Sequence, residues 1–374
     1  MNPSLSNISV DGECYKFTLS GLNVSLANAI RRTILSDIPT TVFYTASGQP
    51  AQCIVHANTT RLHNEILKHR LSCIPIHIQE LDLLPGNYVM ELDMQNDTDS
   101  VIIVSTEHFR IRNKSNDNYL TKEETRKIFP ACAKTNMFID FARLRPRIGD
   151  TIPGEKLKIT CEFSVHTAKD DSMFNVVSKC SYGNTIDTVK ANSVWEDHER
   201  KLKSDGTTND DIAIQKKNFY LLDAHRSYVP DSFDFAIQTV GVYDNKDIIR
   251  KACAVLQNKL VDLQLKLNEI AQANNLNAMQ IKHSETTIEN CYDVILENED
   301  YTIGKVLELI LYERYYQSES ILTYCGFKKF HPHDLDSTIR LAYSSAVDKQ
   351  QVAQHVSNAC MAAIEVFVRI GKMF

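Results

Sequence analysis

The stretch "LNVSLANAIRRTIL" (22–35) decides the fold, because a second stretch, "EDYTIGKVLELILY" (299–312), repeats its pattern. In both, a polar residue directly precedes the first apolar position of the pattern, and we interpret Ser25 and Thr302 as helix caps. Further apolar residues follow three, four and eight positions later, which is the spacing of one buried helix face. This internal similarity predicts two copies of one structural module in a single chain.

A strand-like run precedes each of these helices, and a long helix follows later in each copy. The strand-like runs are "CYKFTL" (14–19) and "CYDVIL" (291–296). Residues 247–272 carry apolar side chains at alternating steps of four and three, and residues 351–374 carry a similar stripe, so both predict long helices with one apolar seam. We therefore predict an α+β fold of two dimerisation modules, each an antiparallel sheet packed with long helices, forming an intrachain pseudo-dimer.

Apolar positions on the two short and two long helices are expected to bury the contact between the modules. These intrachain dimerisation residues are Leu26, Ile30, Ile34, Leu256, Leu260, Leu263, Ile303, Leu307, Leu311, Ala363, Phe367 and Ile370.

A long insertion interrupts the first copy. We predict that residues 1–45 and 225–280 form the first module, that residues 46–224 form a strand-rich inserted domain, and that residues 281–374 form the second module. Within the insertion, residues 195–217 are polar, charged and contain glycine, which is typical of an exposed loop or linker.

Composition limits the classes of function. The chain has 374 residues, of which 43% are apolar and 24% charged, as in ordinary soluble globular proteins. Its net charge of −6 argues against a general phosphate-binding surface, so we expect no direct sequence-specific DNA binding. No run approaches the roughly 20 apolar residues of a membrane span, and the N-terminus lacks the pattern of a signal peptide.

The sequence shows no pattern of a metal or catalytic site. Its ten cysteines occur singly, whereas zinc sites usually pair thiolates close in sequence. The "HPHD" run (331–334) is better explained as a turn, and "DLDS" (334–337) and "ELDLL" (80–84) lack the third carboxylate of a magnesium-binding run. Phosphate-loop and nucleophile-elbow motifs are absent from the sequence. We therefore predict no catalytic residue, metal or cofactor in this chain.

Several stretches together resemble a known family. "GLNVSLANAIRRTILSDIPT" (21–40), "NTTRLHNEILKHRLSCIPI" (58–76) and residues 230–260 resemble the larger alpha-type assembly subunit of archaeal and eukaryotic RNA polymerases, the archaeal D or eukaryotic third subunit. "NEDYTIGKVLELILYE" (298–313) with "LTYCGFKKFHPHD" (322–334) resembles the smaller partner, the archaeal L or eukaryotic eleventh subunit. The second resemblance departs from the family pattern in two places, because Lys305 replaces an asparagine and Phe327 a tyrosine.

The resemblance implies a fusion of the two assembly subunits, as in large DNA viruses that encode their own polymerase. It implies a non-catalytic platform of a DNA-directed RNA polymerase. If the chain is viral, the implied location is the host cytoplasm, with packaging in the virion as a second option; otherwise it is the nucleus. The implied partners are the largest and second-largest subunits, with small zinc-binding subunits, and magnesium and zinc are expected only in those other chains.

The resemblance also assigns contact residues on two helices of the larger-subunit part. On a helical wheel, the side of 22–35 opposite the apolar face carries two arginines, which the repeat replaces by Glu308 and Leu309. We therefore expect this basic side to bind the second-largest subunit and the Glu308 side to face the largest. The residues predicted at these large-subunit interfaces are Asn28, Arg31, Arg32, Leu35, Glu65, His69, Arg70 and Glu308.

Three alternatives stay open from the residues alone. The helix-like run 61–71, with Leu62, Ile66 and Leu67 on one side, is also compatible with an ordinary solvated helix. The chain is also compatible with a free-standing enzyme whose site lies in 46–224, or with a DNA-binding transcription factor, although the acidic balance opposes the latter. The enzyme alternative would use His56, His63 or Cys73.

Overall fold

The computed structural model describes residues 1–46, 52–149, 151–271 and 281–374, with the backbone alone for residues 269–271. The chain divides into two compact units. Unit 1 contains Met1–Ile34, Lys179–Gln238 and Asn245–Phe374, and unit 2 contains Leu35–Ser178 and Thr239–Asp244.

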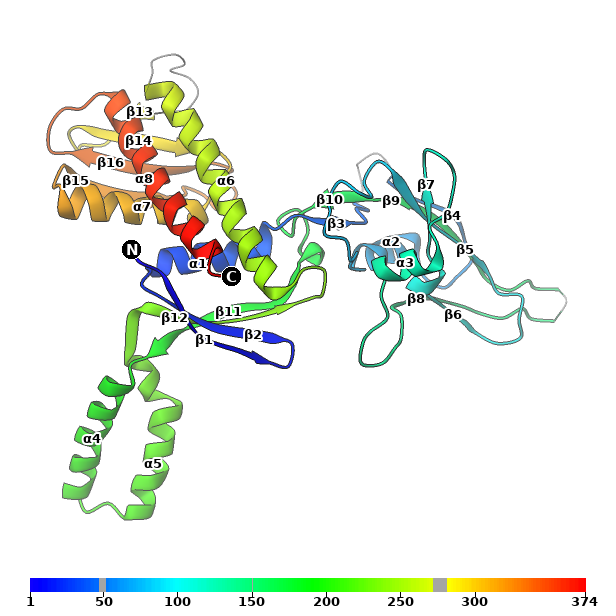
Figure 1. Cartoon of the computed structure of the whole chain (residues 1–374), viewed down its shortest axis with the longest axis horizontal. Helices are drawn as coiled ribbons and strands as arrows, with labels where there is room; N and C mark the ends of the chain where they lie inside the picture. Colours follow the sequence, from blue (N-terminus) through cyan, green and yellow to red (C-terminus); the bar gives the residue numbers. More distant parts are fainter. Residues whose placement is uncertain (47–51, 150, 272–280) are drawn as a thin grey trace. The chain divides into compact units, whose positions relative to one another are not determined.

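Unit 1 contains two four-stranded sheets with the same strand arrangement. The first has the order β1-β2-β12-β11 and the second the order β13-β14-β16-β15 (Figure 1). When the four strands of each sheet are numbered in chain order, the first and second are neighbours. The fourth strand lies between the second and the third. The strands are β1 (Ser4–Asp11), β2 (Cys14–Ser20), β11 (Val177–Ile186) and β12 (Tyr228–Thr239), and β13 (Ile281–His283), β14 (Cys291–Leu296), β15 (Leu322–Lys328) and β16 (Ser337–Tyr343).

Helices occupy equivalent places in the two halves of unit 1. Each half runs strand, strand, helix, strand, strand, helix, with a helical pair added between the last two strands of the first half. The helices are α1 (Val24–Ser36), α4 (Thr188–Ser204), α5 (Asn209–Leu221), the short η3 (Asp223–Arg226), α6 (Asn245–Ala271), α7 (Tyr301–Leu311), the π-helix η4 (Tyr312–Ser318) and α8 (Lys349–Gly371).

The helices α1 and α7 begin in the same way, although not at the predicted caps. The side chain of Asn23 accepts a hydrogen bond from the Ser25 amide at 2.9 Å, and the side chain of Asp300 accepts one from the Thr302 amide at 2.8 Å. Asn and Asp favour such positions because their side-chain oxygens satisfy amides that lack a partner in the first helical turn. The prediction that Ser25 and Thr302 are the caps was therefore wrong by two residues in both copies.

The long helices α6 and α8 lie side by side in unit 1 (Figure 1). The Ser357 hydroxyl on α8 donates a hydrogen bond to the Asn268 side chain on α6 at 2.9 Å. The twelve apolar residues predicted to bury the contact between modules are all buried, at 9% exposure or less. Burial of each large apolar side chain stabilises this core by roughly 1.5–3 kcal/mol.

The last residue of the chain connects α8 to the first sheet. The Phe374 ring lies edge-on to Phe17 with ring centroids 4.9 Å apart, and also contacts Tyr15. Phe17 in turn stacks on Phe235 of the neighbouring strand at 5.2 Å. The Phe374 carbonyl also accepts a hydrogen bond from Arg250 of α6. The end of the second half is therefore part of the core of the first half.

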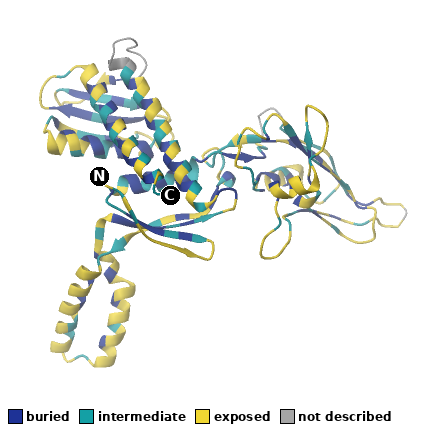
Figure 2. Cartoon of the chain, viewed as in Figure 1, coloured by how far each residue is buried: buried dark blue, intermediate teal, exposed yellow. Residues whose placement is uncertain are grey.

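The segment 195–217 is a helical hairpin and not the predicted loop. Most of α4 and α5 falls within it, and Figure 2 shows that both helices expose most of their surface. A small core of Trp195, Ile212 and Phe219 holds the two helices together. The prediction was wrong because the exposed charged faces dominate the composition, whereas a few well-spaced apolar residues suffice to pair two short helices.

Unit 2 is mainly built of strands. It contains a four-stranded sheet of order β4-β9-β5-β7 and two strand pairs, β6-β8 and β10-β3. Its elements are β3 (Thr40–Val42), β4 (Cys53–Asn58), α2 (Asn64–Ser72), β5 (Tyr88–Gln95), β6 (Ile102–Ser105), η1 (Thr106–His108), β7 (Arg110–Asn113), α3 (Lys122–Ile128), β8 (Asp140–Leu144), β9 (Lys156–Glu162), β10 (Ser164–His166) and η2 (Ser172–Phe174). One continuous apolar core, which includes Phe43, Phe109 and Phe141, fills its interior.

The units do not end where the sequence suggested. The sequence assigned residues 46–224 to the insertion, whereas Lys179–Gln238 belongs to unit 1 and Leu35–Ser178 to unit 2. The physical reason is that β11 pairs with β12 and so completes the first sheet of unit 1.

Candidate partner-binding surfaces

Arg32 on α1 binds the first turn of α7. Its Nη2 lies 2.7 Å from a carboxylate oxygen of Asp300, and its Nε donates to the Thr302 hydroxyl at 2.9 Å. Asp300 is the residue that caps α7, so one arginine of the first half holds the helix cap of the second half. The helical wheel predicted that Arg32 lies on the outer side of α1, but it did not predict this partner.

The charge of Asp300 is favoured by its surroundings. Burial acts to raise the pKa of its carboxyl, but hydrogen bonds from Thr302 and the nearby Arg32 guanidinium outweigh burial and hold the pKa below its usual value. Its position at a helix N-terminus also favours a negative charge. The Arg32–Asp300 pair is half exposed, with side-chain exposures of 42% and 36%, so its attraction is partly screened by water.

Arg31 does not share this contact. Its guanidinium donates to the Asn28 side chain of the same helix at 3.2 Å. Arg31 also acts on Cys180 of β11. Burial raises the pKa of the Cys180 thiol to about 12, and the positive charge of Arg31 opposes that rise. Asn28, Arg31 and Leu35 are half-buried and together form the outer face of α1.

Glu308 occupies the place of Arg31 in the second half. It pairs with Lys305 one turn earlier on α7, and its backbone carbonyl accepts a hydrogen bond from the Cys325 thiol at 3.6 Å. Both side chains are partly exposed. The two halves therefore present different charges at equivalent positions, as the repeat predicted.

In unit 2, α2 carries three of the predicted contact residues. Arg70 donates to the backbone carbonyls of Phe141 at 2.8 Å and Asp140 at 2.7 Å, which anchors α2 to β8. Glu65 and His69 are exposed. The predicted apolar side is partly wrong, because Ile66 is 47% exposed, whereas Leu67 and also Leu71 are buried.

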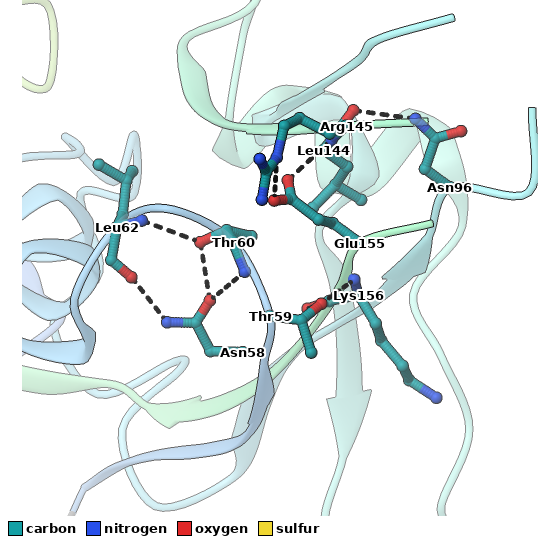
Figure 3. Close-up of polar contacts among 9 residues, drawn as sticks. All are labelled: Asn58, Thr59, Thr60, Leu62, Asn96, Leu144, Arg145, Glu155 and Lys156. Carbon is teal, nitrogen blue, oxygen red and sulfur yellow. Dashed lines mark hydrogen bonds and ion pairs between the residues drawn. The ribbon is translucent and has the colours of Figure 1, made fainter. Parts of the chain in front are cut away.

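A hydrogen-bonded loop leads from β4 into α2 (Figure 3). The Asn58 side chain accepts from the amide and hydroxyl of Thr60 at 2.9 and 2.7 Å, and its own amide group donates to the Leu62 carbonyl at 2.7 Å. Thr59 exchanges hydrogen bonds with the backbone of Lys156 on β9. The loop is thus fixed by its own side chains, which gives α2 a defined starting point.

A second network in Figure 3 contains two buried polar side chains, Asn96 and Glu155, that no sequence motif marks. The fully buried side chain of Asn96 donates a hydrogen bond to the Leu144 carbonyl at 2.9 Å. The backbone amide of Asn96 donates a second hydrogen bond, to the Glu155 carbonyl. The Glu155 carboxylate accepts from the Arg145 amide at 2.8 Å and also pairs with the Arg145 guanidinium. These groups tie the ends of β5, β8 and β9 together. No spacing rule marks such residues, since they are distant in sequence.

The residues of the enzyme alternative have separate surroundings. His56 hydrogen-bonds the Thr160 hydroxyl at 2.9 Å, His63 precedes α2, and Cys73 contacts Met173 at 3.8 Å.

The "HPHD" run forms a turn, as predicted, in which the His331 amide donates to Asp334 and the His333 amide donates to the His331 ring. Across the described ranges, no cluster of three or more His, Cys, Asp or Glu side chains could hold a metal ion. Among the helices that the structure describes, none is long and apolar enough to cross a membrane.

The arrangement is that of an α+β protein in which antiparallel sheets are packed with long helices. The RNA polymerase Rpb3/Rpb11 dimerisation domain family matches residues 16–260, and the chain belongs to this family. It is an Rpb3/Rpo3-like subunit of a DNA-directed RNA polymerase, with a role in assembly and no catalysis of its own.

Individual proteins are similar to parts of the chain. The Rpo3 subunit of DNA-directed RNA polymerase from Pyrococcus furiosus is 24% identical over 266 residues, which covers 65% of this chain and 89% of that protein. The human subunit RPAC1 of RNA polymerases I and III is 34% identical over 70 residues, or 19% of this chain and 18% of RPAC1. A conjugation stage-specific protein of Tetrahymena thermophila is 32% identical over 97 residues, so the match spans 26% of this chain and only 27% of that relative.

Proposed function

We propose that this single chain supplies both halves of an Rpb3/Rpb11-type dimer and so forms the assembly platform of a multisubunit RNA polymerase. The observation that carries the proposal is the repeated strand order: β13-β14-β16-β15 has the arrangement of β1-β2-β12-β11. The family match ends at residue 260, and the second sheet with α7 and α8 follows it. The residues after 280 would be the Rpb11-like half.

Three contacts support the pairing of the two halves within unit 1. Arg32 binds the cap of α7, Ser357 of α8 binds Asn268 of α6, and Phe374 packs on the first sheet. Covalent linkage replaces a bimolecular encounter by an intramolecular one, so the pairing no longer depends on subunit concentration.

We assign the outer faces of α1 and α2 and the exposed part of α7 to the large subunits. Asn28, Arg31 and Leu35 would contact the second-largest subunit together with Glu65 and His69, and Glu308 would face the largest. Arginine suits this role because its guanidinium binds carboxylates and carbonyl oxygens in a fixed geometry. We assign Arg32 and Arg70 to contacts within the chain, which their hydrogen bonds already occupy. Small zinc-binding subunits complete the proposed assembly, with magnesium and zinc held in the other chains.

Charge reversal at Arg31 tests the interface. The Arg31→Glu variant leaves the Arg32–Asp300 contact in place, so the isolated chain should keep its circular dichroism spectrum and melting temperature. Co-expressed with the large subunits, it should recover less than a tenth of the second-largest subunit that the parent chain recovers. Arg200→Glu, an equal reversal on α4, is the matched control and should recover it normally. Full recovery with Arg31→Glu would overturn the assignment.

A reconstitution tests the fusion itself. The full chain, co-expressed with the two large subunits and without any other alpha-type subunit, should yield a stable complex of three chains. A requirement for an added Rpb11-like chain would refute the proposal.

A further inference from the structure

Two cysteines lie directly opposite each other in the sheet of unit 2. Cys53 on β4 and Cys161 on β9 are register partners in an antiparallel pair. The neighbouring partners are linked by a hydrogen bond from the Glu162 amide to the Gln52 carbonyl at 2.8 Å. Since hydrogen-bonded and non-hydrogen-bonded pairs alternate in an antiparallel ladder, Cys53 and Cys161 occupy a non-hydrogen-bonded position.

This position brings the two side chains unusually close. Opposite residues of a non-hydrogen-bonded pair have Cα atoms about 4.5 Å apart, and their side chains point to the same face. That spacing falls within the range of roughly 4.4–6.8 Å that disulfides span. Both cysteines are free thiols, with exposures of 3% and 0%.

The environment makes the two thiols chemically unequal. Hydrogen bonding with Cys161 lowers the pKa of the Cys53 thiol despite burial, and the nearby Lys68 of α2 acts in the same direction. The same contact and burial raise the pKa of Cys161. Because the thiolate is the nucleophile, Cys53 is the thiol prepared to attack first. Cys53 is also the first residue of β4, so fraying of the strand end would expose it before Cys161.

We propose that Cys53 and Cys161 form a reversible disulfide that joins β4 to β9 when the chain meets an oxidised low-molecular-weight disulfide such as glutathione disulfide. In the first step, the Cys53 thiolate attacks one sulfur of glutathione disulfide, forms a mixed disulfide and releases one glutathione thiolate. In the second, Cys161 loses its proton and attacks the Cys53 sulfur, which releases the second glutathione. Two protein thiols are oxidised, one glutathione disulfide is reduced, and the protons pass to the two glutathione thiolates.

The bond would act on the surface assigned to the large subunits. β4 ends in the loop around Asn58 (Figure 3). The helix α2, which carries Glu65 and His69, follows this loop. A cross-link at the start of β4 would therefore fix this strand against β9 and stiffen the support of α2. Disulfides that close long loops restrict the unfolded chain most, so the oxidised chain should melt at a higher temperature.

Oxidation of the full chain tests the proposal. The folded protein, checked by circular dichroism, is incubated with glutathione disulfide, remaining thiols are alkylated, and the cross-linked peptides are identified by mass spectrometry. We expect one peptide pair joined through Cys53 and Cys161, and a melting temperature raised by several degrees that dithiothreitol reverses. Cys161→Ser should abolish both changes, whereas Cys253→Ala on α6 should abolish neither. Failure of the parent chain to form the Cys53–Cys161 link, or a link formed only after unfolding, would overturn the proposal.

Discussion

The contact between Arg32 and the cap of α7 gives the sharpest prediction about how the two halves hold together. Removing the guanidinium in Arg32→Ala deletes an ion pair at 2.7 Å and a hydrogen bond at 2.9 Å. Half-exposed ion pairs contribute about 0.2–1 kcal/mol, and a typical intramolecular hydrogen bond contributes about 0.5–1.5 kcal/mol. We therefore expect the free energy of unfolding of unit 1 to fall by about 1–2 kcal/mol, which lowers its melting temperature by roughly 2–8 °C.

A double-mutant cycle isolates the charged pair. Asp300→Asn keeps a good capping side chain and removes only the charge, so the cycle of Arg32→Ala with Asp300→Asn should give a coupling free energy of about 0.5–1 kcal/mol. The assay is thermal and urea unfolding of the full chain, with hydrogen exchange of α7 amides as the local readout. Arg31→Ala is the matched control, since Arg31 bonds Asn28 in its own helix and should cost less than about 0.5 kcal/mol.

The pH dependence of the coupling free energy between Arg32 and Asp300 supplies a second criterion. Since the folded-state pKa of Asp300 lies below its unfolded value near 3.8, the stabilisation is present above that pH and is lost as pH falls through the folded pKa. The coupling should therefore be full at pH 7 and vanish only once the pH has fallen below the folded-state pKa of Asp300, which lies under 3.8. A coupling of zero at pH 7, or an Arg31→Ala variant that loses as much stability as Arg32→Ala, would refute the reasoning.

Three further predictions concern the second half and its attachment. A Cβ on Gly304 would overlap the Phe327 ring, so Gly304→Ala should destabilise unit 1 by about 1–3 kcal/mol in urea unfolding, and Gly304→Ala with Phe327→Leu should recover part of the loss. Phe374→Ala should cost about 2–4 kcal/mol by the same assay, because it removes a ring packed against Phe17, and a loss below 1 kcal/mol would contradict that packing. Burial lowers the pKa of His355 below 6.5, so its neutral form is favoured and stability should fall as pH drops below about 6.5. In His355→Phe, the difference between the melting temperatures at pH 7.5 and pH 5.5 should be smaller than in the parent chain. An unchanged difference would exclude His355 as the source of the pH dependence.

Periodicity made much of unit 1 predictable. The apolar steps in 22–35 and 299–312 determine which face of α1 and α7 is buried, and the seams of α6 and α8 do the same for the long helices. The caps were misplaced because a side chain can satisfy the first helical amides from two residues upstream, as Asn23 and Asp300 do. Aligning the two stretches places Asn23 opposite Asp300, and this signal in the sequence was available.

Contacts between distant segments were not predictable from local pattern. A helical wheel places Arg32 on the outer side of α1, but it cannot show that the N-terminus of α7 lies there. The α4–α5 hairpin was missed because only Trp195 and two other large apolar residues carry its core, within a strongly charged segment. Physical reasoning from one sequence therefore identifies faces more readily than the partners of those faces.

The central claim is that one polypeptide performs the role of two assembly subunits, and isolation of the native complex tests it most directly. The complex would be captured through this chain from its native source under non-denaturing conditions, and every companion identified and quantified by mass spectrometry. The account predicts both large RNA polymerase subunits in equal amount to this chain and no separate Rpb11-like subunit. A stoichiometric Rpb11-like companion, or capture without the large subunits, would contradict it.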